Sequence, residues 1–110
     1  MAKAWKELER RVAIFWSRIF PEAKRNPLSG SVDDSTHADV KNMPIYIEAK
    51  HSGRVPFHQV YLKSCEQARK EGKDITVVHF HSKGSPIIIT MMSQDDLDKL
   101  MVRYGESWPR

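Results

Sequence analysis

The sequence predicts an α/β domain in which helices flank a mixed β-sheet. Apolar residues recur at helical spacing in three segments, and strand-like segments lie between them. The predicted order is helix, loop, two strands, helix, two strands, helix, which is typical of a mixed sheet with helices packed on it. A length of 110 residues is close to the commonest domain size, so we assign residues 1–110 to a single domain with one modest core.

The first predicted helix covers residues 3–20 and ends at Pro21. Its apolar residues recur at steps of three and four and form one stripe, made of Trp5, Leu8, Val12, Phe15, Trp16 and Ile19. At about 100° per residue, Glu9 falls at the border of this stripe and Glu7 on the solvent side. The basic residues of the helix fill its polar arc, which suits either a solvated face or a face toward an anionic partner.

Residues 39–50 predict a hairpin whose second strand carries two unexpected charges. Asn42 to Pro44 mark the turn, because Asn favours turns and Pro cannot donate to a sheet ladder. In the strand that follows, Glu48 and Lys50 share one face with Tyr46. The opposite face carries the apolar residues of the alternation, which are Ile45, Ile47 and Ala49.

A turn of two or four residues centred between Asn42 and Met43 pairs Asp39 with Tyr46. Asp39 is then a diagonal neighbour of Glu48 on the same face, about 7–8 Å away at Cα. Two carboxylates at this spacing can share a hard cation such as Mg²⁺. Lys50 can then orient a water molecule or stabilise a charged phosphoryl oxygen. The same pattern also fits a solvated charged face on which Lys50 only pairs with Glu48.

The second half of the chain predicts two more helices. Pro56 opens a helix over residues 57–71, Gly72 ends it, and Cys65 is a small core residue on its inward face. Ser93 caps the last helix, whose first turn is acidic and therefore favours the helix dipole.

Two further strands are predicted at residues 75–80 and 87–91. The run Ile87–Ile89 predicts burial on both faces of its strand. His79 and His81 form a His-x-His pair, which suits a metal site, an edge strand or a partner surface. No further Cys or His stands at zinc spacing, so the metal interpretation is the weakest of the three.

The composition narrows the class of protein. The formal net charge of +4 and a pI near 9.3 favour an anionic partner such as nucleic acid. A single cysteine excludes an internal disulfide and favours a reducing compartment. No apolar run reaches the roughly 20 residues of a membrane span, and charges interrupt the N-terminal segment where a signal peptide would be apolar. We therefore expect a cytoplasmic domain without a membrane partner.

The pattern Asp-x(8)-Glu-x-Lys, with Glu-x-Lys closing an apolar strand, resembles the PD-(D/E)xK nuclease superfamily. The segments Thr36–Val40 and Ile45–His51 look most like its small single-domain members, the archaeal-type Holliday junction resolvases and the short nucleases of phage genomes. The likeness covers roughly residues 5–92, and it departs at Ala38, where the superfamily often has Pro. It implies a restriction-endonuclease-like αβββαβ core followed by a C-terminal helix.

The resemblance also implies an activity. We expect a Mg²⁺-dependent endonuclease that hydrolyses phosphodiester bonds in branched or duplex DNA, with Mn²⁺ able to replace Mg²⁺. Asp39 and Glu48 would hold the metal, Lys50 would orient water or stabilise charge, and Glu9 would join as a further catalytic ligand. Resolvase relatives act as homodimers, and an apolar patch for this could come from Phe20, the Ile87–Ile89 run or the last helix. A phage-encoded enzyme in a bacterial host fits the likeness.

Residues outside this motif are candidates for DNA contacts. The polar, turn-rich loop 22–35 contains Ser29, Gly30 and Ser31, where resolvases have a Ser-Gly loop that reaches the scissile phosphate. The remaining candidates are basic or amide side chains, namely Arg10, Lys24, Arg25, His51, Arg54 and Gln59.

Two alternatives remain open at the level of the sequence. Asp33 or Asp34 can replace Asp39 as the metal aspartate if the strand starts earlier, although Asp-Asp-Ser reads as turn chemistry. The function can also be that of a homing, restriction or repair nuclease that cuts duplex DNA, or of a DNA-binding module without catalysis.

Overall fold

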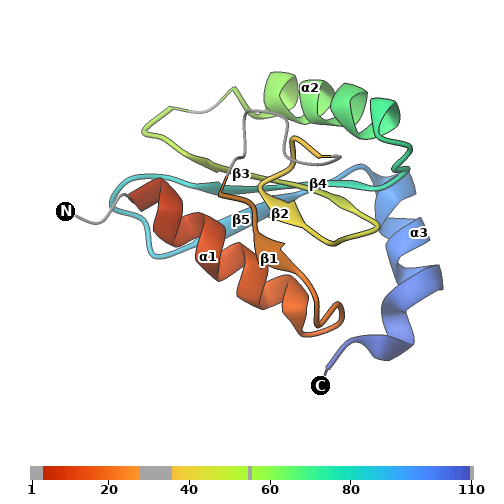
Figure 1. Ribbon diagram of the computed structural model, residues 1–110. Helices are drawn as coiled ribbons and strands as arrows, with labels where there is room; N and C mark the ends of the chain where they lie inside the picture. The colour runs from red at the N-terminus through yellow and green to blue at the C-terminus, as the bar shows by residue number, and fades with distance from the viewer. Residues whose placement is uncertain (1–3, 28–35, 55, 110) are drawn as a thin grey trace.

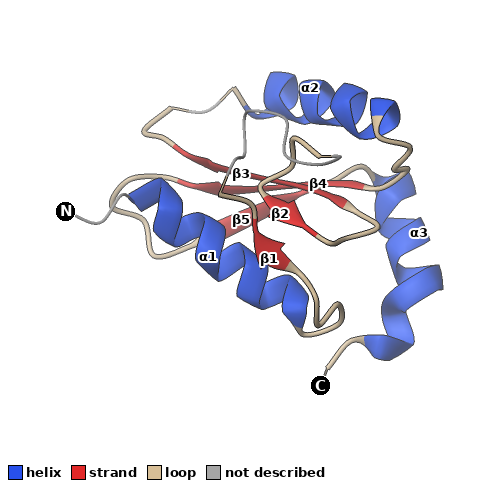
Figure 2. Cartoon of the chain, in the orientation of Figure 1, coloured by secondary structure: helices blue, strands red, loops and turns tan. Residues whose placement is uncertain are grey.

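The computed structural model describes residues 4–27, 36–54 and 56–109. The elements follow the predicted alternation of helices and strands: α1 (Ala4–Ser17), β1 (Lys24–Arg25), β2 (Val40–Lys41), β3 (Tyr46–His51), α2 (Phe57–Lys70), β4 (Thr76–His81), β5 (Ile88–Met91), α3 (Gln94–Tyr104) and the 3₁₀ helix η1 (Gly105–Ser107). The predicted mixed α/β class is therefore confirmed, as Figure 2 shows.

The strands form two sheets. The larger has the order β3-β4-β5, with β3 parallel to β4 and β4 antiparallel to β5. Helix α2 makes the crossover between the two parallel strands, as such a pair requires. The smaller sheet pairs β1 with β2, and it brings Arg25 opposite Val40.

Helices cover both faces of the larger sheet. Figure 1 shows α1 on one side and α2 on the other, with α3 beyond one end of the strands. The α1 side buries Ile47 and Val77 together with Trp16 of the helix. On the α2 side, Val78 and Phe80 pack with Tyr61 in a second cluster. Because each face has a helix against it, successive residues of β4 are buried.

The predicted burial of the Ile87–Ile89 run is wrong. Ile87 is 62% exposed and Ile89 is 53% exposed, whereas Ile88 packs against the main core. Strand β5 lies at the end of the strand order and pairs only with β4 among the described strands. Ile88 therefore faces the core, whereas its neighbours Ile87 and Ile89 point to the opposite, more exposed face of the strand.

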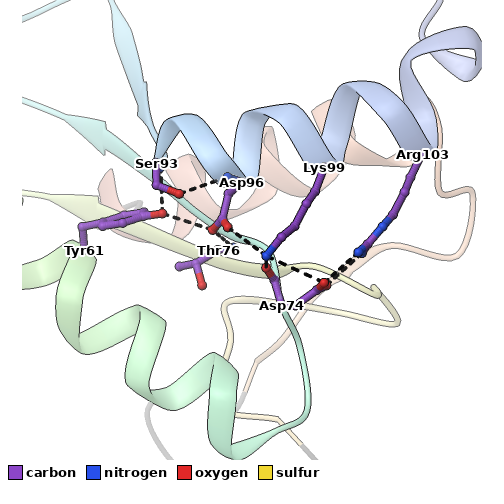
Figure 3. A network of polar contacts seen from close by, with 7 residues as sticks. All are labelled: Tyr61, Asp74, Thr76, Ser93, Asp96, Lys99 and Arg103. Carbon is purple, nitrogen blue, oxygen red and sulfur yellow. Dashed lines mark hydrogen bonds and ion pairs between the residues drawn. The ribbon is translucent and has the colours of Figure 1, made fainter.

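A polar network ties α3 to the rest of the domain, as Figure 3 shows. Ser93 caps the helix as predicted, with its side chain accepting from the Asp96 N–H at 3.0 Å. The buried Asp96 accepts from the Thr76 N–H at 2.9 Å and from the Tyr61 hydroxyl at 3.1 Å. The same hydroxyl accepts from the Ser93 N–H at 2.8 Å. One carboxylate thus joins α3, α2 and the start of β4.

The remaining expectations concern element ends and membranes. Helix α1 ends at Ser17 and not at residue 20. The residues that follow form a turn, in which the Ile19 and Phe20 N–H groups donate to the Trp16 carbonyl. Cys65 is half-buried against the Tyr61 cluster. Within the described ranges, no helix is long and apolar enough to cross a membrane.

Candidate functional site

Asp39 lies against the edge of β3 that faces away from β4. Its backbone N–H donates to the Ile47 carbonyl at 2.9 Å, and its Oδ2 accepts from the Ala49 N–H at 2.7 Å. The predicted pairing of Asp39 with Tyr46 is therefore wrong by one residue. The turn holds Asn42 in the left-handed region at φ 64°. Turn conformation sets hairpin register, and here Asp39 pairs one residue further along β3 than predicted. At this edge of β3, the Asp39 carboxylate rather than a backbone carbonyl therefore accepts the Ala49 N–H.

The backbone around Asp39 is held from the other side by a buried asparagine. The Asn26 N–H donates to the Asp39 carbonyl at 2.8 Å, and Asn26 Nδ2 donates to the Ala38 carbonyl at 2.9 Å. Asn26 follows directly after β1, so the small β1–β2 sheet and this side chain act together. Asp39 is therefore fixed at both its backbone and its carboxylate.

Strand β3 presents its charged residues as predicted. Tyr46, Glu48 and Lys50 line one pocket beside α2, whereas Ile47 and Ala49 pack into the core on the α1 side. The Lys50 Nζ lies 3.7 Å from Glu48 Oε2. The Glu48 side chain is only 16% exposed, but that of Lys50 is 48% exposed. The alternation along the strand therefore places a poorly hydrated acid beside a solvated cation.

Glu9 approaches the same site from α1. It is 5% exposed and belongs to the buried face of the helix, as its position at the border of the apolar stripe predicted. Arg25 of β1 donates from Nε to Glu9 Oε1 at 2.9 Å. Because Arg25 stands opposite Val40, the residue after Asp39, the β1–β2 pairing brings this ion pair to the carboxylates. Three acids, from α1, from β3 and from the bend just before β2, thus meet at one place.

The electrostatics of this carboxylate cluster (Glu9, Asp39 and Glu48) are unfavourable for three negative charges. Burial raises the pKa of Glu48 to about 9, and the neighbouring Asp39 carboxylate adds to the shift. Burial likewise raises the pKa of Glu9 to about 7, again with a contribution from Asp39. Lys50 and Arg25 act in the opposite direction without compensating these effects. A pKa of about 9 keeps Glu48 mainly protonated at neutral pH, and a nearby cation would favour its ionised form.

The donor set fits a hard divalent cation held by two carboxylates. No group of three or more His, Cys, Asp or Glu side chains in the described parts of the chain is arranged to hold a metal ion by itself. Mg²⁺ usually needs only one or two carboxylates and completes its shell with water and substrate oxygens. Asp39 and Glu48 meet this requirement, and the Ala49 N–H orients Asp39 as an outer-shell partner does. Glu9 is already bound to Arg25.

The predicted DNA-binding residues are only partly gathered around the cluster. Arg25 belongs to it, and Lys24 is exposed next to it in β1, paired with Lys41. Arg10 is exposed and lies 3.5 Å from Glu7, the acid predicted to face solvent. Ser29, Gly30 and Ser31 lie outside the described residues, as do the alternative metal ligands Asp33 and Asp34.

The other candidates lie beyond β3. Arg54 is exposed after the strand, and Gln59 lines a separate groove with Glu66 and Arg69, away from Glu48. His51 Nδ1 lies 2.9 Å from His81 Nδ1, and the two rings stack. His81 Nε2 lies 2.6 Å from the Ser85 carbonyl, which can only accept. His81 therefore donates through Nε2 to Ser85 and contacts His51 through Nδ1, at the carboxyl ends of β3 and β4.

His79 has a structural role. The Trp16 Nε1–H donates to His79 Nε2 at 2.8 Å, so His79 Nδ1 carries the proton and bonds Thr90 Oγ1 at 3.0 Å. Burial lowers the pKa of His79 to about 4, which keeps the ring neutral. The His-x-His pattern thus splits into one core contact and one strand-end contact.

Two sets of residues near the cluster were not singled out from the sequence. Lys63, Ser64 and Gln67 of α2 line the pocket that Glu48 and Lys50 share. Their spacing of three to four residues on one helix face was the signal available in the sequence.

Glu71 is the second of these. It accepts from the Thr36 hydroxyl at 2.6 Å and from the His37 N–H at 2.9 Å, just before Asp39. Despite its partial burial, these hydrogen bonds lower the pKa of Glu71. No feature of the sequence marks Glu71, because its partners lie 34 and 35 residues away.

Comparisons of the chain with protein-family models, with curated proteins and with solved structures gave no match. The resemblance to the PD-(D/E)xK superfamily therefore stays a prediction, and the site must be judged on its own chemistry.

Proposed function

We propose that the protein is a Mg²⁺-dependent DNA endonuclease that hydrolyses phosphodiester bonds at the carboxylate cluster, with a preference for branched DNA as in resolvase-like enzymes. One observation carries the proposal. Glu48 and Asp39 meet at one strand edge with Lys50 beside them. The charge of Lys50 does not offset the effect of burial and of Asp39 on the pKa of Glu48. Buried acids with strongly raised pKa values and a charged neighbour are typical of functional sites.

The chain's own residues have distinct roles in this proposal. Asp39 and Glu48 would hold Mg²⁺, which supplies activation of a water molecule and stabilisation of charge on the phosphate. Lys50 can turn toward the phosphoryl oxygen because its side chain is half-exposed and only loosely paired at 3.7 Å. Glu9, with its pKa near 7, can take up a proton at neutral pH while Arg25 fixes its position.

The surroundings of the cluster suit an anionic substrate. The chain carries 18 Lys and Arg against 14 Asp and Glu, and Lys24 and Arg54 are exposed on either side of β3 in the sequence. Backbone phosphates attract such side chains without regard to base sequence. DNA is therefore the substrate class that best fits both the charge and the hard-cation chemistry.

A homodimer is part of the same proposal. The exposed Ile89 of β5, an edge strand among the described residues, lines a groove with Phe57 of α2 and Leu97 of α3. An edge strand can pair with its own copy across a two-fold axis, because an antiparallel pair is self-complementary. Phe20, another candidate for the patch, instead packs against Tyr104. Light scattering at micromolar concentration would give twice the mass of 12.8 kDa, and a monomer mass would exclude this arrangement.

Cleavage by the purified protein tests the activity. The substrates are a four-way junction, a flap, a nicked duplex, a linear duplex and single-stranded DNA, each with Mg²⁺, Mn²⁺ or EDTA. We expect cutting of the branched substrates with either metal and none with EDTA. Cutting of linear duplex at the same rate would indicate a restriction, homing or repair type. DNA binding with no cutting would overturn the enzymatic proposal in favour of a binding module.

A further inference from the structure

A pocket of about 400 Å³ lies between β3 and α2, on the face of the strand that carries its charged residues. Its walls include Tyr46, Glu48 and Lys50 of β3, and Lys63, Ser64 and Gln67 of α2. We call it the α2 pocket. Its volume falls within the range of ligand pockets, which is roughly 300–1,000 Å³.

The α2 pocket and the carboxylate cluster share Glu48. Asp39 and Glu9 reach Glu48 from the β3 edge and from α1, whereas the pocket opens toward α2. A group in the pocket therefore lies next to any phosphate that reacts at the cluster. This continuity distinguishes the α2 pocket from the apolar pocket lined by Trp16 and Trp108, on the other side of the sheet.

The charges of the pocket favour an anion. Lys63 forms no ion pair with any residue in the described ranges, and its side chain is exposed along the pocket wall. Lys50 is paired only with Glu48 there, at 3.7 Å. Once a cation engages Glu48, two ammonium groups remain without an acid partner in the pocket. A phosphate group is the natural occupant for such a pair.

The rest of the wall suits the other parts of a nucleotide. Tyr46 and Val60 contribute ring and aliphatic surface, and Gln67 contributes an amide whose Nε2 is fixed by Glu71 at 3.1 Å. An amide held in this way can read a base edge through its oxygen. The pocket wall therefore offers more polar and apolar surface than the binding of a phosphate group alone requires.

We propose that the α2 pocket is the subsite for the nucleotide next to the scissile phosphate, with Lys63 binding the phosphate of that nucleotide and Gln67 contacting its base. This inference rests on the proposed nuclease function and deepens it. A nucleotide enters such a pocket only after it leaves the base stack, which is easiest where DNA is unpaired or distorted. The substrate class is therefore DNA with an unpaired nucleotide beside the cut, such as a flap or junction.

Binding measurements test the subsite separately from catalysis. Fluorescence anisotropy with labelled flap and duplex DNA, in Ca²⁺ to prevent cleavage, gives affinity as a function of salt. For Lys63→Ala we expect about tenfold weaker flap binding, the scale of one charge-assisted hydrogen bond. We also expect a salt slope reduced by roughly 0.7–0.9, the value of one phosphate contact. Lys63→Arg should restore the slope.

Lys70→Ala is the matched control, because Lys70 is exposed on the same helix and lies outside the α2 pocket. Equal effects of Lys63→Ala and Lys70→Ala on the slope would overturn the subsite. Gln67→Ala should weaken flap binding without changing the slope, and no change with Gln67→Ala would remove its proposed contact with the base. Cleavage by the wild type with no specific effect of Lys63 would reject the subsite and leave the nuclease proposal intact. Lack of any cleavage would reject the nuclease proposal itself.

Discussion

Two groups of carboxylates in this domain have opposite electrostatic surroundings. Asp74, between α2 and β4, accepts hydrogen bonds from both terminal guanidinium nitrogens of Arg103 in the last turn of α3, at 2.8 and 2.7 Å, and these bonds lower the pKa of Asp74 to about 2. Next to it, Asp96 accepts from two donors and has Lys99 at 3.7 Å (Figure 3). In the carboxylate cluster, burial and mutual repulsion raise the pKa of Glu48 to about 9.

The contrast separates acids whose charge is stabilised by their partners from acids whose pKa stays raised although Arg25 and Lys50 lie beside them. Around α3, the chain supplies donors and cations for its own carboxylates, so nothing further is required. At β3, the same chain crowds three carboxylates near a strand edge, and burial together with the neighbouring Asp39 raises the pKa of Glu48 to about 9 and that of Glu9 to about 7. An external cation is the simplest group that completes the second arrangement, and that completion is the core of the proposed function.

Replacing Glu48 by Gln should have the largest effect and should separate the two groups most clearly. We expect cleavage to fall by at least about a hundredfold, because the metal ion loses a ligand and its positive charge is no longer held beside the phosphate. We also expect the metal-free protein to become more stable at pH 8 by about 1 kcal/mol or more, because the wild type must take up a proton on Glu48 to fold at this pH and the variant need not. Cleavage rates and urea unfolding measure the two effects.

Glu66→Gln is the control for this change, since Glu66 is exposed on α2 and lies away from the cluster. It should leave both quantities unchanged. Wild-type cleavage by the Glu48→Gln protein would show that the cluster is not the catalytic site.

Replacing Asp96 by Ala should lower the stability of the protein, in contrast to Glu48→Gln. The change leaves the buried Thr76 N–H and the Tyr61 hydroxyl without their acceptor, so we expect a loss of about 2–3 kcal/mol in unfolding free energy. Asp98→Ala, on the exposed side of the same helix, provides the reference. If Asp96→Ala were as stable as Asp98→Ala, the network in Figure 3 would not hold α3 in solution.

The pH dependence of stability should reveal the cluster in the absence of metal. The folded pKa values of Glu48 and Glu9, about 9 and about 7, lie above the usual value of 4.5. The folded state therefore binds more protons than the unfolded state between these values, and stability must fall as pH rises from about 5 to 9. Each group contributes a slope of up to about 1.4 kcal/mol per pH unit.

Thermal unfolding in EDTA and in Mg²⁺ measures this effect. Mg²⁺ should raise the melting temperature more at pH 8.5 than at pH 5.5, because the ion requires deprotonated carboxylates. A melting temperature in EDTA that rises steadily up to pH 9 would contradict the electrostatic description of the cluster.

Replacing Asp74 by Asn should have the smallest effect. Although Arg103 holds the carboxylate through two hydrogen bonds, the pair is exposed, and exposed ion pairs add little to stability. We expect a decrease in melting temperature that is smaller than that of Asp96→Ala and that disappears in high salt. A decrease as large as that of Asp96→Ala would mean that the ion pair anchors α3.

Local patterns in the sequence predicted the parts of the fold that depend on one element at a time. The period of two along β3 placed Glu48 and Lys50 on the same face, and the apolar stripe of α1 placed Glu9 at a buried border. Features that depend on several elements could not be read in this way. The exposure of Ile87 and Ile89 follows from the place of β5 in the sheet, which no local pattern gives.

In the candidate site, too, the features that could not be predicted depend on several elements. The position of Asp39 one residue out of the predicted register depends on the conformation of Asn42 in the turn. The part of α2 that faces Glu48 depends on the rotation of the helix over the sheet, so Lys63 and Gln67 line the pocket, and Gln59 does not. Arg25 meets Glu9 because β1 packs against α1, a contact between elements that no local pattern gives.

Proton release on metal binding tests the central claim most directly. Isothermal titration of the protein with Mg²⁺ or Mn²⁺ at pH 7.5, in buffers of different ionisation enthalpy, counts the protons released per ion. With the pKa of Glu48 near 9, the proposal requires about one proton per bound ion in the wild type and none for Glu48→Gln. Metal binding with no proton release, or equal binding by both proteins, would show that the ion does not use this cluster.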